Sequence, residues 1–311
     1  MLRDGLLDVP GRFDVRRLCA LFHVRRSRLG FRAVLTAFFL VTAQDLAAQP
    51  PESDELPLWE FRVAAFGRYS PVYPGAADHN LTLLPLPYPV YRGSRLRFGD
   101  DMDEIAEGRV LTRSRVDVDI NFNVNFGADS EDISVRQGMS DLDLLLEIGP
   151  ELEINLNNRP AVEGELLLAL QLRAAVSFDG SDATGRGAVF SPEVEYRLDQ
   201  AFGTRNDWSV RWTSVWGSED YADYYYEVAP EFATMERPGF NASSGYIGSE
   251  FRVGIVRQIS ERLKFDGSAK LWINNGAENR HSPLLQDDYG LGVQAAFSWT
   301  LGTSARRGTA H

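Results

Sequence analysis

One stretch of the chain alternates apolar and polar residues for longer than a soluble strand usually runs. It is Arg115–Phe126, with the sequence RVDVDINFNVNF. Its even-numbered residues, from Val116 to Phe126, are all Val, Ile or Phe, and its odd-numbered residues, from Asp117 to Asn125, are all Asp or Asn. Because side chains alternate between the two faces of a strand, the pattern predicts one apolar and one polar face. Soluble strands mostly have about five or six residues, and a tilted strand crossing a bilayer needs about nine to eleven, so the length favours a membrane strand.

The N-terminus has the layout of a secretory signal. Arginines between Arg25 and Arg32 precede the apolar run Ala33–Ala43, and small residues follow up to Ala48. An anchoring helix is the alternative, but such a helix needs about 20 apolar residues and this run is too short. The pattern therefore predicts a signal peptide over 1–48 that is cleaved after Ala48.

The charge and the cysteine content of the exported chain argue against two classes of function. Removing residues 1–48 takes away eight arginines and four acids, which leaves 24 basic and 40 acidic residues and a net charge of −16. Nucleic-acid binding needs a basic surface, so we expect no nucleic-acid partner. The only cysteine, Cys19, leaves with the signal, which predicts neither a disulfide nor thiol chemistry.

Twelve stretches after the signal alternate as strands do. They are 59–69, 81–92, 95–99, 104–112, 115–126, 144–156, 162–178, 188–199, 208–216, 246–257, 263–273 and 289–301. A proline-rich, acidic lead-in over 49–58, which we expect to be disordered, precedes them, and a polar tail over 302–311 follows. No stretch of the exported chain has the eighteen or more apolar residues of a transmembrane helix.

The connections between these stretches alternate between short and long. The short ones fall around 113, 157–160, 200–207 and 259–262, and the long ones at 70–80, 127–141, 179–187, 217–243 and 274–287. This alternation is typical of outer-membrane barrels, with short periplasmic turns and long extracellular loops. We therefore predict an all-β, antiparallel transmembrane β-barrel over 59–301 with about 12 strands (roughly 10 to 14), in the outer membrane and in contact with its lipid. A soluble barrel or sandwich is the alternative.

Three prolines alternate within the stretch 81–92. Pro85, Pro87 and Pro89 lack a backbone donor, and residues two apart direct their backbone groups to the same neighbouring strand. All three missing donors therefore lie on one edge. The stretch is either an irregular extended segment at a rim or one weakened seam in an otherwise closed sheet.

If the apolar faces meet lipid, the opposite faces line the lumen with charge. The main candidates for lining the lumen or contacting a partner are Asp117, Asp119, Glu151, Glu153, Glu163, Glu165, Arg173, Glu193, Glu195 and Arg197. The remaining charged residues on these faces are Arg62, Arg211, Glu250, Arg252, Lys264, Asp266 and Lys270. Buried charges need partners or water, so the lumen is either plugged by salt bridges or a wet channel.

An acidic cluster is expected at the periplasmic mouth of the lumen. Glu153, Glu163 and Glu165 flank the same short turn. The cluster would favour cationic solutes or a basic partner. This hypothesis fails if neutralising all three residues changes neither partner binding nor cation passage.

The sequence gives little support for catalysis or for a metal site. After the signal the chain has only His79, His281 and His311, and it has no Gly-x-Ser-x-Gly motif with which to build a nucleophile and its base. Asp220, Asp223 and Glu227 could offer oxygen ligands to a cation, but a solvated acidic loop explains them equally well. We expect no catalytic residue, no metal and no cofactor.

Five segments of the chain carry a resemblance to a known family. They are YSPVYPGAADHN (69–80), LLPLPYPVYRG (83–93), WGSEDYADYYYEV (216–228), RPGFNASSGY (237–246) and NGAENRHSP with DDYGLGV (275–293). In this order, over about 59–301, they resemble the MipA/OmpV family of outer-membrane proteins of the Gram-negative envelope. The end of the chain departs from the family, whose members tend to finish on an aromatic closing strand. Here Phe297 and Trp299 are followed by Leu301 and ten further residues.

The resemblance implies a barrel without catalysis of its own. The family's namesake is linked to a membrane-bound lytic transglycosylase and to a peptidoglycan synthase of the penicillin-binding class, and other members are associated with adhesion or uptake. The expected function is therefore a scaffold for cell-wall (peptidoglycan) remodelling enzymes. The alternative is a small cation-leaning channel or an adhesion or uptake protein. A scaffold predicts co-purifying enzymes and no conductance, a channel predicts conductance, and an enzyme would depend on His281.

Overall fold

The computed structural model describes residues 56–93, 97–99, 111–113, 115–157, 164–201 and 204–308. The expected signal peptide, most of the lead-in, Glu163 and most of the predicted strand 104–112 lie outside these residues. Within them, none of the helices is long and apolar enough to cross a membrane.

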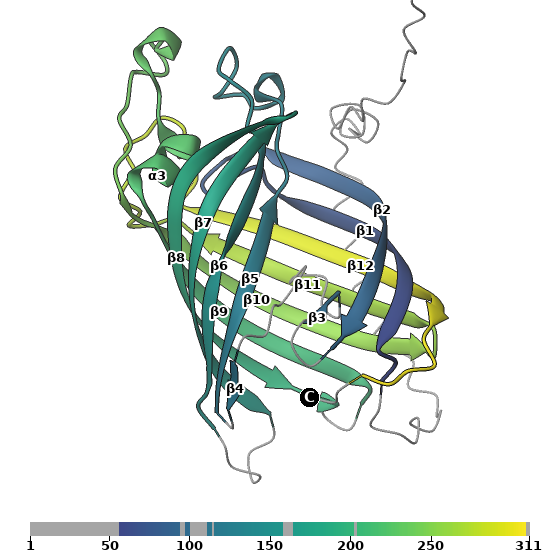
Figure 1. Ribbon diagram of the computed structural model, residues 1–311. Helices are drawn as coiled ribbons and strands as arrows, with labels where there is room; N and C mark the ends of the chain where they lie inside the picture. Colours follow the sequence, from purple (N-terminus) through teal and green to yellow (C-terminus); the bar gives the residue numbers. More distant parts are fainter. Residues whose placement is uncertain are drawn as a thin grey trace, which may run out of the picture.

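The described residues form one antiparallel sheet that curls into a half-barrel (Figure 1). Ten strands are long, with 10 to 17 residues each, and two short strands stand at the ends of the sheet. The strands are β1 Trp59–Pro71, β2 His79–Arg92, β3 Arg97–Phe98, β4 Leu111–Arg113, β5 Val116–Asn125, β6 Leu144–Asn155, β7 Glu165–Asp179, β8 Asp182–Leu198, β9 Asn206–Gly217, β10 Gly245–Ser260, β11 Leu263–Ile273 and β12 Tyr289–Thr303. The predicted all-β antiparallel fold is confirmed, and the count of twelve includes the two short strands.

The order of strands in the sheet is β3-β2-β1-β12-β11-β10-β9-β8-β7-β6-β5-β4. Every neighbouring pair is antiparallel, and the first and last long strands in sequence, β1 and β12, pair over ten positions. Strands that follow one another in sequence therefore pair, except β3 and β4, and β1 pairs in addition with β12. This up-and-down order leaves β2 with β3 and β5 with β4 at the two edges of the described sheet.

On most strands the outer face is apolar and the inner face is largely polar or small. β2 is the exception, because Leu86, Tyr88 and Val90 lie on the same face as the inward Ala64, Arg62 and Glu60. Along β7, Leu167, Ala169, Gln171 and Arg173 are buried, while Leu172 between them is 53% exposed. Large apolar side chains are exposed on most of the other strands as well, including Ile120, Phe190, Trp212, Phe251 and Trp299. Exposed apolar bands of this kind are favourable only against lipid.

Two of the expected long loops differ in the structure. The loop expected at 179–187 is wrong, because β7 and β8 continue into a tight hairpin in which Asp179 pairs with Asp182. Gly180 has a φ of 63°, which glycine adopts at little cost and which lets the chain reverse in two residues. The loop expected at 217–243 contains a helix, α3 Glu219–Tyr226.

The main apolar core lies at the end of the barrel that carries the long loops. Four tyrosines of α3 pack with Tyr73 from the β1–β2 loop, and we call these five residues the tyrosine cap. Further buried residues of the cluster come from other loops and strand ends: Ala76, Ile133, Leu142, Leu145, Ala175, Val189, Ala222, Ala242, Ile247, Ala277 and Leu285. In Figure 1, α3 lies at this end beside the upper part of β8.

The opposite end of the sheet brings the two ends of the described chain together. Leu58 donates its backbone N–H to Arg306 O at 2.8 Å, and Gly308 donates to Leu56 O at 2.8 Å. Ordered structure thus extends beyond the predicted limits of 59–301 at both ends. We call this end, which carries the short connections, the turn end, and the other the loop end.

Candidate functional site: the lumen and its cap

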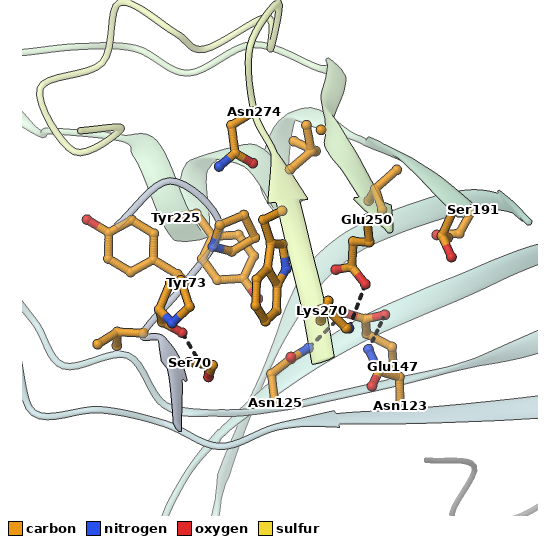
Figure 2. A pocket seen from close by; sticks show the side chains of 18 of the residues that line it. Ser70, Tyr73, Asn123, Asn125, Glu147, Ser191, Tyr225, Glu250, Lys270 and Asn274 are labelled. Atoms are coloured by element: carbon orange, nitrogen blue, oxygen red, sulfur yellow. Dashed lines mark hydrogen bonds and ion pairs between the residues drawn. The ribbon is translucent and has the colours of Figure 1, made fainter. Parts of the chain in front are cut away.

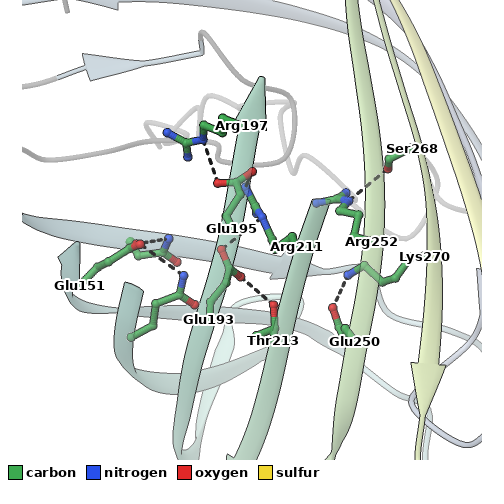
Figure 3. A network of polar contacts seen from close by, with 12 residues as sticks. Glu151, Glu193, Glu195, Arg197, Arg211, Thr213, Glu250, Arg252, Ser268 and Lys270 are labelled. Atoms are coloured by element: carbon green, nitrogen blue, oxygen red, sulfur yellow. Dashed lines mark hydrogen bonds and ion pairs between the residues drawn. The ribbon is translucent and has the colours of Figure 1, made fainter. Parts of the chain in front are cut away.

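The first polar network of the lumen lies on β8 and β9. Glu195 accepts from Arg197 Nε at 2.8 Å and from Arg211 Nη2 at 3.0 Å (Figure 3). Glu193 lies 3.1 Å from Arg211 Nε and accepts from the Thr213 hydroxyl at 2.7 Å. Alternation along the two strands turns all five side chains inward, so the opposite charges meet across the ladder.

The second network centres on Glu147 of β6, whose side chain is 1% exposed. Arg173 Nε donates to Glu147 Oε2 at 3.0 Å, and Asn123 and Asn125 donate their amide N–H groups at 3.2 and 3.1 Å. The Tyr221 hydroxyl of α3 donates to Glu147 Oε1 at 3.0 Å. Burial raises the pKa of Tyr221 well above its ordinary value, so its hydroxyl keeps the proton that it donates. Glu147 therefore joins the barrel wall to the cap.

Two further ion pairs lie on other parts of the wall. Lys270 Nζ of β11 lies 2.6 Å from Glu250 Oε2 of β10 and 5.0 Å from the centre of the Trp272 ring. Near the turn end, Glu60 pairs with Arg62 at 2.6 Å and with Arg92 at 2.7 Å. Charge-assisted contacts of this length compensate for part of the cost of burying charge.

The acids of β5 and β6 face one another directly. Asp117 is opposite Glu153, and Asp119 is opposite Glu151. Glu151 also accepts from the amide of Asn121 at 2.7 Å. Like charges directly opposite across a ladder repel, so these four carboxylates form the most acidic part of the wall that the structure describes.

The acidic cluster expected at the 157–160 turn is described only in part, because Glu163 lies outside the described residues. Glu153 is opposite Asp117 on β5 and Ala169 on β7, and Glu165 is opposite Arg197 on β8. The cluster therefore stays a prediction.

The alternating prolines lie on β2, which pairs with β1 over thirteen consecutive positions. Pro85, Pro87 and Pro89 are opposite Ala65, Val63 and Phe61, and the register with β1 does not shift at any of them. Their missing donors therefore belong to the other edge of β2. On that edge, β3 pairs only with Tyr91 and Arg92.

Sequence reasoning missed several residues that the structure places at the site. Glu147 was absent from the candidates although its position on β6 gives it the same face as Glu151 and Glu153. The cap tyrosines were assigned to a loop. The signal that could have found them is the spacing of Tyr221, Tyr224 and Tyr225, which puts three rings on one side of a helix.

A cavity of about 170 Å³ lies between the cap and the polar wall (Figure 2). Its lining includes Asn123, Asn125, Tyr225, Lys270 and Trp272. A second cavity, of about 120 Å³, lies among the charged residues Glu195, Arg197, Arg211, Arg252 and Asp266.

The residues considered for catalysis or metal binding are described by their contacts and by their pKa. The His79 ring nitrogens lie 3.1 Å from Ala77 O and 3.3 Å from Leu291 O, and its ring stacks on Tyr69. Within the described part of the chain, no group of three or more His, Cys, Asp or Glu side chains is arranged to hold a metal ion. Burial, together with Glu227, Glu219 and Asp220, raises the pKa of Asp223 to about 6.

A single antiparallel sheet with an apolar outer face and a charged interior defines an outer-membrane β-barrel protein. Residues 63–301 match the family described as MltA-interacting protein MipA, and the chain belongs to this family. The family prediction is thereby confirmed. Among curated proteins, none matches the sequence.

Three solved structures show a weak similarity to the chain. One is the COG4313 outer membrane channel from Pseudomonas putida F1, at 12% identity and a TM-score of 0.32, covering 81% of this chain and 100% of that one. Another is the CymD monoaromatic hydrocarbon channel, at 8% identity and a TM-score of 0.29, covering 81% and 89%. A third is OpdO of Pseudomonas aeruginosa, at 11% identity and a TM-score of 0.27, covering 78% and 96%.

Proposed function

We propose that this outer-membrane barrel is a non-enzymatic scaffold that holds cell-wall remodelling enzymes. Its first partner would be a lytic transglycosylase of the MltA type, and its second a peptidoglycan synthase of the penicillin-binding class. The observation that carries the proposal is the family match over 63–301, because the family is described by its interaction with MltA.

The interior of the barrel supports binding over passage. Glu147, Glu195 and Glu250 all have basic partners within 3.0 Å, and the tyrosine cap packs across the loop end. When the charges in a lumen are paired with one another, few charged groups are left to bind a solute as it crosses the barrel. The protein therefore presents surfaces to partners rather than a wide water-filled path.

The surface for a periplasmic enzyme would be the turn end. Arg205, in the connection between β8 and β9, is exposed there. Arg159 belongs to the predicted turn 157–160 and is outside the described residues. The exposed basic side chain of Arg205 would suit an acidic patch on a partner.

Crosslinking in cells tests this proposal. A photoreactive amino acid is placed at Arg205, and a matched probe replaces Met235, which is fully exposed in the loop that follows η4 Pro230–Phe232. We expect a transglycosylase or synthase to be captured from position 205 and not from position 235. Capture from 235 alone, or from neither position, contradicts the scaffold.

A second candidate, a cation-leaning channel, is favoured by the facing acids of β5 and β6. Planar-bilayer recordings on the purified protein would then give cation-selective conductance that falls in a Glu151→Gln, Glu153→Gln variant. An absence of conductance together with capture at position 205 supports the scaffold alone. The same recordings on a Glu153→Gln, Glu163→Gln, Glu165→Gln variant test the expected acidic mouth.

A further inference from the structure

The cavity below the tyrosine cap has the size of a one-ring molecule. Its volume is about 170 Å³. An engineered protein cavity of about 150 Å³ is large enough to hold benzene. A ligand of one six-membered ring therefore fits this space.

Four of the five charged residues that line the cavity form two ion pairs, and the fifth, Arg68, lies over the Phe126 ring at 5.9 Å. Arg173 lies 3.0 Å from Glu147, and Lys270 lies 2.6 Å from Glu250. A charged ligand would have to break one of these pairs, which is costly away from water. The lining therefore favours a neutral ligand.

Two amide oxygens at the cavity offer acceptors with fixed positions. Asn123 and Asn125 both donate from Nδ2 to Glu147, and among the described residues neither side-chain oxygen accepts a hydrogen bond. Because the amide nitrogen of each side chain is fixed by its hydrogen bond to Glu147, the position of the amide oxygen is fixed as well. This oxygen can accept a hydrogen bond from a ligand. The ligand should thus carry O–H groups along one edge.

Aromatic residues also line the cavity. Tyr225 of α3 and Trp272 at the end of β11 both line the cavity, and Lys270 holds the Trp272 ring from one side at 5.0 Å. Figure 2 shows Tyr225 above the polar group formed by Asn125, Glu147 and Lys270. Aromatic faces bind apolar C–H surfaces, while the amide side binds hydroxyls.

We infer that this cavity is a binding site for a neutral monosaccharide-sized sugar. A sugar ring combines an apolar face of C–H bonds with a rim of hydroxyl donors and carries no charge, which matches the three features of the lining. Trp272 and Tyr225 would contact the face, and Asn123 and Asn125 would accept from the rim. The site is at the loop end, so sugar binding and partner capture from Arg205 are separate properties.

Binding is tested on the purified full-length barrel in a detergent without a sugar headgroup. Isothermal titration calorimetry is run with D-glucose, D-galactose and N-acetyl-D-glucosamine, and with benzoate and L-arginine as charged comparators. We expect saturable binding of at least one of the neutral sugars at one site per chain, and weaker or no binding of both comparators. Binding of no neutral sugar, or tighter binding of either comparator, overturns the proposal.

Variants locate the site. Trp272→Ala should weaken sugar binding about tenfold or more, and Trp272→Phe, which keeps an aromatic face, should recover most of the affinity. Trp212→Phe is the control, because Trp212 is exposed on the outer face of β9. Equal affinity in Trp272→Ala and the wild type, or an equal loss in Trp212→Phe, contradicts the assignment.

A measurement on the wild-type protein covers the case in which the alanine variant does not fold. In saturation-transfer NMR, irradiation of the aromatic protons should transfer mainly to the ring C–H protons of the bound sugar. Transfer that is absent, or uniform over all sugar protons, argues against stacking on Trp272 and overturns the proposal.

Discussion

The loop end and the strand interior fill the same barrel in different ways. At the loop end, Tyr73 and the tyrosines of α3 pack ring against ring, with centroid distances such as 4.7 Å between Tyr224 and Tyr225. Between the strands, the inner face is filled by carboxylates and guanidinium groups within about 3 Å of each other. The cap is a small soluble-type core, and the lumen is a polar network.

The difference follows from what surrounds each region. The cap can turn its polar backbone to water and bury its rings, as any soluble domain does. Most strands turn their apolar side chains to lipid, so mainly polar and small residues are left for the inside. Tyr221 and Glu147 connect the two regions through one hydrogen bond of 3.0 Å. The predictions below test how far the regions depend on this contact.

Glu147→Ala should have the largest effect, because it disturbs both regions. It leaves Arg173 buried without its carboxylate and removes the acceptor of Tyr221, which we expect to lower the free energy of unfolding by about 4 kcal/mol. Urea titration of the refolded protein in detergent measures this value. Lys270→Gln, at a more exposed pair, is the matched control and should cost much less; equal losses would contradict a central role for Glu147.

Tyr226→Ala should weaken the cap and spare the strands. The Tyr226 side chain is fully buried, and its hydroxyl donates to Pro74 O at 3.0 Å. We expect a loss of about 3 kcal/mol, confined to the loop end, since removing a buried aromatic ring leaves a cavity. Limited proteolysis should become faster in 227–244, while the strands stay protected. Met235→Ala, at a fully exposed site, should change neither, and faster cleavage throughout the strands would show that the regions are not separate.

Tyr221→Phe isolates the contact between the regions. It removes the hydroxyl and keeps the ring, so we expect a loss of about 2 kcal/mol, as for other hydrogen bonds to charged groups. A double-mutant cycle with Glu147→Gln measures the coupling directly. If the two effects simply add, the hydrogen bond does not link the cap to the wall.

Asp223 should make the cap sensitive to pH while the strand network is unaffected. Its pKa is raised from 3.8 to about 6 by burial and by the neighbouring acids Glu227, Glu219 and Asp220, so the folded cap binds the proton more tightly than the unfolded chain does. The resulting stabilisation is fully present below the unfolded pKa and is lost as the pH rises through about 6. Hydrogen-exchange protection factors in α3, which correct for the intrinsic pH dependence of amide exchange, should therefore be higher below pH 6 than above it. Asp223→Asn should remove this dependence, and a dependence that persists in the variant would assign it to another group.

The strands could be predicted from the sequence because their pattern is local. Ten of the twelve predicted stretches overlap the ten long strands in order, from β1 to β12. Lipid on one side favours an apolar outward face on each strand, whatever the neighbouring strands are. The alternation in Val116–Asn125 is therefore enough to predict a strand and its outward face. The tight hairpin at Gly180 was missed because the polar residues around it also fit a loop.

The pairing of charges could not be predicted in the same way. Glu147 was overlooked because its partners lie on β5, β7 and α3, and its contact with Tyr221 spans 74 residues. The expected cluster of Glu153, Glu163 and Glu165 followed from their closeness in sequence. The contact of Glu153 with Asp117 depends instead on the register between β5 and β6.

The sequence by itself determined that the chain forms an antiparallel barrel with apolar side chains outward and charges inward, because each strand must satisfy lipid independently of the others. Only the tertiary structure decided which charges pair and that the loop 217–243 folds into a helix that caps the barrel. These features depend on contacts such as that of Tyr226 with Pro74, 152 residues apart. Contacts of that kind arise only after the strands have brought the loops together.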